Sequence, residues 1–213
     1  MPPPLRSLSP RELQRASADT VSHYEERARA FWESTKHHDV KENVEALLRH
    51  TEGKAPFAIL DLGCGPGRDL ATFKALGHEP VGLDASPTFV KMARKHAGCE
   101  VWQQDLLRLE LPVARFDGIF ANAVLFHVAS QELVRVLRDL HRTLRPGGVL
   151  FASNPRGPDI EGHDGDRYGC WMRLETWRDY VTEAGFVEIE HYYRPRGRAI
   201  EVQPWLATVW RKG

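Results

Sequence analysis

A chain of 213 residues, 42% of them hydrophobic, can bury one sizeable α/β core, but it is too short for two comfortable domains. Its 29 Lys and Arg side chains equal its 29 Asp and Glu side chains, so the formal net charge is zero. Because proteins that hold nucleic acid through its phosphates usually carry a surplus of positive charge, nucleic acid is not an expected partner.

The cysteines and the apolar segments of the chain predict where in the cell the protein is found. Three cysteines without a CxxC pair indicate reduced thiols rather than a disulfide framework, and no metal site is predicted. The first residues, MPPPLRSLSP, lack the apolar centre of a signal peptide, and no apolar run approaches the roughly 20 residues of a membrane span. We therefore expect a cytoplasmic protein without a membrane partner, and leave open whether it is a monomer or a dimer.

The first part of the chain carries signals for helix starts. Residues 1–18 are predicted to be a mobile leader ahead of a single domain over 19–213. The capping-box patterns SPRE at 9–12 and SHYE at 22–25 predict two successive N-terminal helices. DVKE at 39–42 opens a third helix in the same way.

From residue 57, apolar runs typical of strands alternate with amphipathic stretches typical of helices. The predicted strands cover residues 57–62, 80–84, 100–104, 116–122, 148–153, 186–193 and 204–210. The predicted helices cover residues 67–76, 87–97, 130–144 and 174–184. This alternation predicts βαβ units, with a mostly parallel sheet and helices on both of its faces. Residues 154–172 lack periodicity and are predicted to be a long functional loop.

A glycine-rich turn follows the first predicted strand. The stretch ILDLGCGPGRDL, residues 59–70, places Gly63, Gly65 and Gly67 in this turn. Doubly wound sheets bind ligands at the carboxyl ends of their strands, where glycines remove Cβ atoms that would collide with a nucleotide. A tight turn that packs a helix against a strand needs the same glycines, so the motif has two interpretations.

Two carboxylates end the next two predicted strands. Asp84, in VGLDAS, can accept hydrogen bonds from both hydroxyls of a ribose. Asp105, in WQQD, can bind an adenine amino group while Leu106 closes on the ring. Since both carboxylates lie at the ends of the strands that follow the glycine turn, together they favour an adenosine site.

The same segments, with FDGIFANAVLFHV and LHRTLRPGGVLFAS, resemble the successive motifs of the class I S-adenosylmethionine-dependent methyltransferases, especially the type-11-like small-molecule group. The resemblance is close over residues 55–155. It implies a Rossmann-like doubly wound sheet of seven mostly parallel strands, with an antiparallel last strand at PWLATVWRK. It also implies S-adenosyl-L-methionine as the cofactor and S-adenosyl-L-homocysteine as the product.

Position by position, the resemblance implies a set of cofactor contacts. The methionine portion would be held by Asp61, Gly63, Gly65 and Gly67, and the ribose by Asp84. The adenine would be framed by Ala85, Gln104, Asp105 and Leu106. Asn122 would lie beside the cofactor where the fourth strand ends. In the family an N-terminal helix often folds over the cofactor. Residues 19–53 would therefore form a helical lid, with Tyr24 as a contact.

His127, in ANAVLFHVAS, follows the fourth predicted strand at the rim where an acceptor would meet the methyl group. An imidazole titrates in the useful pH range, so His127 is the best candidate for a general base. A histidine near the start of a helix can equally bond the backbone, which leaves a structural role open. A base is needed only for an acceptor that enters protonated, because the sulfonium is already a potent methyl donor.

Further polar clusters predict a compact, polar or heteroaromatic acceptor. The candidate acceptor-binding residues are His37, His38, Tyr168 and Tyr193. Because the surrounding loops are rich in histidine and acidic residues, N-methylation of an amine or imidazole is favoured. O- or S-methylation of a small molecule, methylation of a protein, and non-catalytic binding of S-adenosylmethionine are the alternatives.

Two other enzyme classes fit less well. A nicotinamide dehydrogenase would require a glycine where Arg68 stands, and the chain has no Tyr-x-x-x-Lys pair. Methyltransferases directed at bases or glutamine carry an Asn/Asp-Pro-Pro-aromatic motif after the fourth strand. This chain has ANAVLF at that place.

Overall fold

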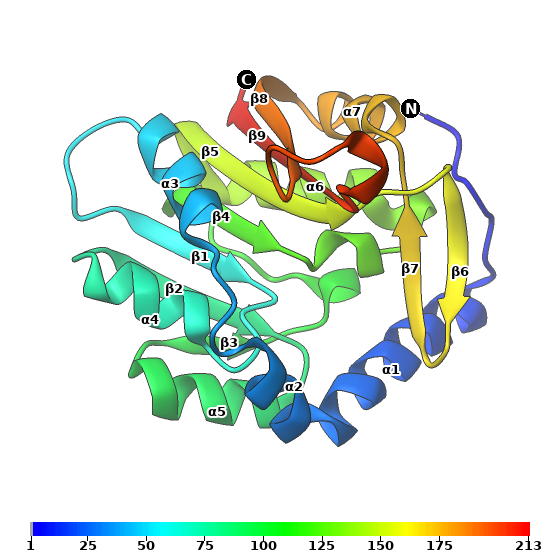
Figure 1. Cartoon of the computed structure of the whole chain (residues 1–213), viewed down its shortest axis with the longest axis horizontal. Coiled ribbons are helices and arrows are strands. Elements are labelled where there is room, and N and C mark those ends of the chain that lie inside the picture. Colours follow the sequence, from blue (N-terminus) through cyan, green and yellow to red (C-terminus); the bar gives the residue numbers. More distant parts are fainter. Residues whose placement is uncertain (1) are drawn as a thin grey trace.

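A seven-stranded sheet forms the centre of the computed structural model, which describes residues 2–213 (Figure 1). Its strands are β1 (Ala58–Leu62), β2 (Glu79–Asp84), β3 (Val101–Gln103), β4 (Phe116–Asn122), β5 (Leu144–Pro155), β8 (Phe186–Arg194) and β9 (Trp205–Lys212). They lie in the order β3-β2-β1-β4-β5-β9-β8. The strands β1 to β5 are parallel, and β9 is antiparallel to both of its neighbours. The predicted Rossmann-like sheet with an antiparallel last strand is confirmed.

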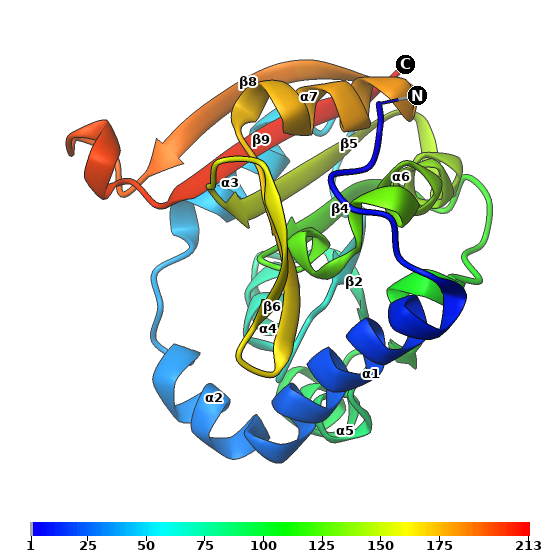
Figure 2. The ribbon, with the colours of Figure 1, turned by 90° about the vertical axis from the view of Figure 1, so that its right-hand side faces the viewer.

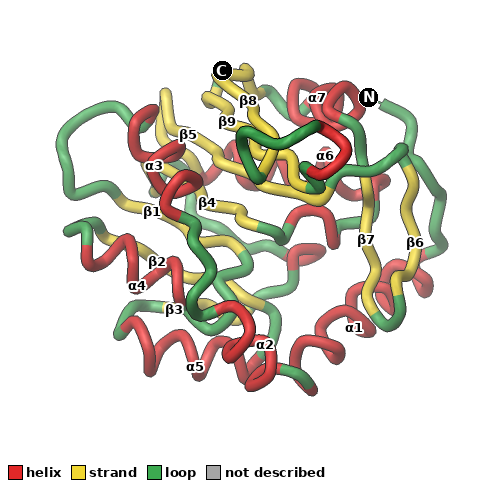
Figure 3. Tube along the Cα trace, viewed as in Figure 1, coloured by secondary structure: helices red, strands yellow, loops and turns green. Residues whose placement is uncertain are grey.

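Helices cover both faces of this sheet (Figure 3). They are α3 (Lys41–His50), α4 (Arg68–Ala75), α5 (Pro87–Ala97), α6 (Ser130–Thr143) and α7 (Leu174–Glu183). Neighbouring strand residues point to opposite faces. Accordingly, Ile59 packs with Leu47 of α3, while Leu60 belongs to the cluster that contains Leu137 of α6. The helices predicted after residue 57 are all present, with ends within one residue of the predicted ones.

The N-terminal helices differ from the prediction. Helix α1 spans Pro10–Glu26, with Ser9 as its cap in a complete capping box, and α2 spans Ala28–Thr35. The second predicted capping box is wrong, because Ser22 lies inside α1 and its hydroxyl donates to Glu26 at 3.1 Å. A serine caps a helix only where its own backbone is extended, and the capping pattern does not specify that condition.

The segment ahead of α1 is attached to the domain. The Tyr180 hydroxyl donates to the Pro3 carbonyl at 2.8 Å, and the Leu5 amide donates to Ser130 Oγ at 2.8 Å. Leu8 exchanges two hydrogen bonds with the Gln131 amide group. The leader boundary predicted at residue 18 therefore falls within α1, while Met1 lies outside the described residues.

Residues 154–172, predicted to be a loop, contain a β-hairpin. The strands β6 (Ile160–Asp164) and β7 (Arg167–Trp171) pair antiparallel around Gly165, whose φ is +61°. Figure 2 shows this hairpin extending from the sheet toward α1. The loop prediction is wrong because β6 is mostly polar, which hides the alternation of a strand, although the sequence DGD is a hairpin-turn signal.

Candidate functional site

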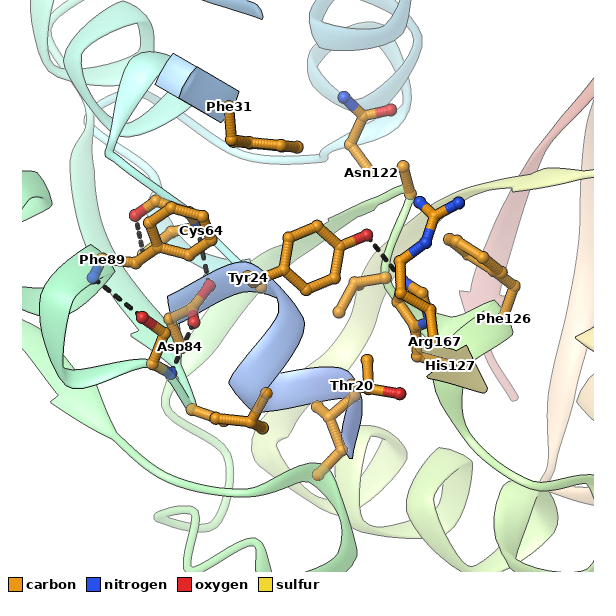
Figure 4. A pocket seen from close by; sticks show the side chains of 18 of the residues that line it. Thr20, Tyr24, Phe31, Cys64, Asp84, Phe89, Asn122, Phe126, His127 and Arg167 are labelled. Atoms are coloured by element: carbon orange, nitrogen blue, oxygen red, sulfur yellow. Dashed lines mark hydrogen bonds between the residues drawn. The ribbon is translucent and has the colours of Figure 1, made fainter. Parts of the chain in front are cut away.

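A cavity of about 640 Å³ lies at the carboxyl ends of the parallel strands, under α1 and α2 (Figure 4). Such a volume is typical of pockets for small organic ligands. The predicted site residues that line it are Tyr24, His38, Gly63, Gly65, Asp84, Ala85, Gln104, Asp105, Leu106, Asn122, His127 and Tyr168. Four other predicted site residues, within the described range 2–213, lie outside this lining: Asp61, Gly67, His37 and Tyr193.

The turn after β1 brings the backbone to the cavity. Gly63 and Gly65 both have positive φ, +65° and +51°, and a Cβ on Gly63 would lie 2.3 Å from Val124 Cγ2. A side chain at Gly63 would therefore collide with the loop after β4. Gly67 serves the packing of two helices instead, since a Cβ there would lie 2.8 Å from the Cα of Ala93 in α5.

Asp84 closes this turn from the end of β2. Its Oδ2 accepts the Gly65 amide at 2.9 Å and its Oδ1 accepts the Ser86 amide at 2.9 Å. Burial raises the pKa of Asp84 to about 6, although these amides act in the opposite direction. A carboxylate offers about four lone-pair positions, so it can also accept from a hydroxyl donor of a ligand.

Asp61 lies buried beneath the turn and off the cavity wall. Asp61 is only 2% exposed, and its Oδ2 has no hydrogen-bond partner among the described residues. Burial and the neighbouring Asp69 raise the pKa of Asp61 well above its ordinary value. Asp61 is therefore not part of the cavity lining, and its role as a cofactor contact stays a prediction.

An apolar slot adjoins Asp84. Leu83, Phe89, Leu106 and Leu107 line it, next to Asp105. Asp105 Oδ1 accepts the Leu107 amide at 2.8 Å, and its Oδ2 accepts the Ser17 hydroxyl of α1 at 2.8 Å. These contacts fix the Asp105 carboxylate at the edge of the apolar slot.

The Gln104 side chain, at the same edge, bonds the backbone of its own loop. Its carbonyl accepts the Glu110 amide at 2.9 Å, and its amide group donates to the Glu110 carbonyl at 3.2 Å. Both polar ends of this amide are therefore engaged within the loop.

At the other end of the cavity, His127 lies between two partners. Its Nδ1 is 2.6 Å from the Tyr168 carbonyl oxygen, and its Nε2 is 2.9 Å from the Tyr24 hydroxyl. A carbonyl only accepts, so Nδ1 carries the hydrogen and Nε2 accepts the Tyr24 proton. Burial lowers the pKa of His127 to about 4, which keeps the ring neutral. Neither nitrogen is free, and this disfavours the role of general base.

Arg167, the first residue of β7, also lines this end and was not among the predicted site residues. Figure 4 shows it next to His127, with Tyr24 facing both. Its guanidinium opposes the rise that burial gives to the pKa of Tyr24, and it contributes to the lowered pKa of His127. No local sequence signal marks Arg167, because only the hairpin brings it to the cavity.

Helix α1 is fastened over the cavity by Glu25. Its carboxylate accepts the Thr88 amide at 3.1 Å and the hydroxyls of Ser86 and Thr88. These donors lie at the N-terminus of α5, where a negative charge is favoured by the helix dipole. The Tyr24 ring, next to Glu25, packs on Phe31 and Phe89 with centroids 5.5 and 6.0 Å away.

Within residues 2–213, no group of three His, Cys, Asp or Glu side chains is arranged to hold a metal ion. None of the helices in that range combines the length and apolar character required to cross a bilayer.

Comparison with known proteins gives a consistent result. The profile of the methyltransferase domain family matches residues 59–148. Trans-aconitate 2-methyltransferase of Azoarcus sp. (strain BH72) is 38% identical over 107 residues, which cover 49% of this chain and 42% of that protein. The thiol S-methyltransferase TMT1B of Mus musculus is 30% identical over 171 residues, 70% of this chain and 66% of that protein.

Among solved structures, a Burkholderia thailandensis 1,6-didemethyltoxoflavin-N1-methyltransferase with bound S-adenosylhomocysteine shares the fold with a TM-score of 0.76. It is 21% identical, and the match covers 97% of this chain and 92% of that one. The chain spans only about half the length of the first curated relatives that it matches, 42% and 52%.

Proposed function

The chain belongs to the class I S-adenosylmethionine-dependent methyltransferases, and on this premise we propose that it moves a methyl group from S-adenosyl-L-methionine to a small polar molecule. The observation that carries the proposal is Asp84, a half-buried carboxylate that accepts the Gly65 amide of the glycine turn. A carboxylate in this place suits the two hydroxyls of a ribose.

The remaining cofactor contacts follow from the same cavity. The backbone at Gly63 and Gly65 would lie along the methionine portion, because no Cβ obstructs it. The slot beside Asp105 and Leu106 would take the adenine, and Tyr24 would cover the cofactor from α1. When bound, the cofactor supplies a methyl group activated by a sulfonium.

At the acceptor end, the chain's own residues orient the acceptor and exclude water. His127 holds the Tyr24 hydroxyl, and α1 and α2 close the cavity from above. In this proposal His127 is a positioning residue. The names of the relatives include O-, S- and N-methyltransferases, so they do not select the methylated atom.

Calorimetric titration with S-adenosylhomocysteine tests the proposal. Asp84→Asn should weaken binding by about 2 to 4 kcal/mol, because a charge-assisted acceptor of ribose hydroxyls is lost. The matched control is Asp117→Asn. Asp117 accepts the Ala58 amide at 2.8 Å at the opposite end of the sheet, and this variant should bind like the parent chain. Absence of any binding heat for the parent chain would overturn the proposal.

A further inference from the structure

We propose that the acceptor is a carboxylate, held by Arg167 and methylated on oxygen to give an ester. This inference rests on the proposed function and goes beyond it, because it selects one acceptor class. It differs from the N-methylation that the sequence favoured. The charges and lone pairs that face the acceptor end of the cavity favour a carboxylate.

Three arginines are among the described residues that line the cavity. Arg167 is the one whose positive charge is least neutralised by nearby carboxylates. Arg68 forms a two-pronged pair with Asp69 at 2.7 and 2.9 Å. Arg194 lies 3.4 Å from a Glu42 oxygen and donates to the Asp39 carbonyl at 3.0 Å.

The ion-pair partner of Arg167 is Asp164, on the same hairpin at 3.2 Å. The Asp164 side chain is 65% exposed. Exposed pairs contribute little and exchange readily, because water screens both charges. Arg167 can therefore offer its planar pair of donors to a ligand carboxylate, which is the geometry that a guanidinium matches best.

The ionisable side chains next to Arg167, His127 and Tyr24, are not available as bases. Both nitrogens of His127 are engaged, and burial raises the pKa of the Tyr24 hydroxyl and of the Cys64 thiol. The carboxylates Asp84 and Asp105, which accept backbone amides, lie toward the other end of the cavity. An acceptor that enters protonated, such as an ammonium, thiol or phenol, would need a base that His127 and Tyr24 do not supply.

A carboxylate enters already deprotonated at neutral pH. Its oxygen lone pair forms the new O–C bond to the methyl carbon, and the C–S bond breaks with its electron pair left on sulfur. The negative charge of the acceptor and the positive charge of the sulfonium cancel, and no proton moves. The step therefore requires no general base, in agreement with the hydrogen bonds that engage both nitrogens of His127.

The test uses S-adenosylmethionine with an isotopically labelled methyl group, incubated with the full chain and a pool of small metabolites that contains carboxylates, amines, thiols and phenols. Methyl esters release their label as methanol in mild alkali, whereas N-methyl and S-methyl products retain it. We expect alkali-labile label. Alkali-stable label would overturn this inference and leave the proposed function intact.

Arg167→Gln and Arg167→Lys provide the second arm. The labelled product identifies the acid, which is then titrated into chain saturated with S-adenosylhomocysteine. Arg167→Gln should weaken its binding at least about tenfold, and Arg167→Lys should restore part of it, since a point charge replaces the two-pronged donor. Affinity for S-adenosylhomocysteine alone should not change.

The matched control is Arg142→Gln, which removes a surface pair with Asp139 of 2.9 Å on α6. It should bind the acid like the parent chain. Equal acid binding by Arg167→Gln and the parent would overturn the inference. A chain that binds S-adenosylhomocysteine but labels nothing would overturn the proposed methyl transfer, and the ester with it.

Discussion

At the scale of single residues, two hydrogen-bond partners determine the protonation state of His127. The Tyr168 carbonyl fixes the tautomer, and the Tyr24 hydroxyl occupies the remaining nitrogen. Protonation of Nε2 would break the hydrogen bond from Tyr24 and place a charge in a buried site. The pKa of His127 is therefore lowered from 6.5 to about 4.

This lowered pKa has a consequence for stability. The neutral His127 ring contributes to the free energy of unfolding. This contribution is fully present above pH 6.5, where the ring is neutral in the folded and unfolded chain, and it is lost as the pH falls toward 4. We expect the parent chain to lose up to about 3 kcal/mol from this residue over that range. His127→Asn lacks the titrating ring, so the difference between its unfolding free energy and that of the parent, measured in urea, should shrink by the same amount. A constant difference would contradict the assignment.

At the scale of elements, one carboxylate joins α1 to α5. Glu25 accepts from three donors of Ser86 and Thr88, and the Ser86 amide in turn donates to Asp84. The contact that closes the cavity is thus continuous with the proposed ribose site. Loss of charge at Glu25 should loosen α1 without removing any cofactor contact.

Glu25→Gln should increase the dissociation rate of S-adenosylhomocysteine by about five- to thirtyfold, which corresponds to 1 to 2 kcal/mol for charge-assisted hydrogen bonds. Hydrogen exchange of the α1 amides should rise in parallel. The neighbouring Glu26 has a side chain 68% exposed and pairs with Arg27 on the surface, so Glu26→Gln is the control. Similar exchange and dissociation in both variants would show that Glu25 does not fasten α1.

At the scale of the whole molecule, the N-terminal segment is bonded to helices that lie far along the chain. Residues 3–8 bond to α6 and α7, and the side chains of Leu5 and Leu8 pack against the core cluster. Helix α1 then crosses the cavity to reach α2. The leader therefore anchors the start of the covering helix.

Deletion of residues 2–8, which keeps the Ser9 cap, should lower the melting temperature by roughly 5 to 10 °C. The loss corresponds to about 2 to 3 kcal/mol from several hydrogen bonds and two apolar contacts. Differential scanning calorimetry measures it, with Ser7→Ala at an exposed position as the control. An unchanged melting temperature would show that residues 2–8 do not stabilise the fold, as expected for a mobile leader.

Sequence by itself determined the sheet, the order of its helices and the turn at Gly63 and Gly65. These features depend on periodicity and on backbone conformations that a few residue types favour, and both are local. Asp84 was also located from the sequence, because the end of a parallel strand in a doubly wound fold has a known place.

Only the tertiary structure decided what each side chain meets. It placed Gly67 against α5, buried Asp61 beneath the turn, and fixed the neutral tautomer of His127. It also brought Arg167 to the acceptor end through a hairpin that the polar sequence of β6 concealed. Residues 24, 127 and 167 are far apart in the chain, and their contact depends on long-range packing that no local pattern encodes.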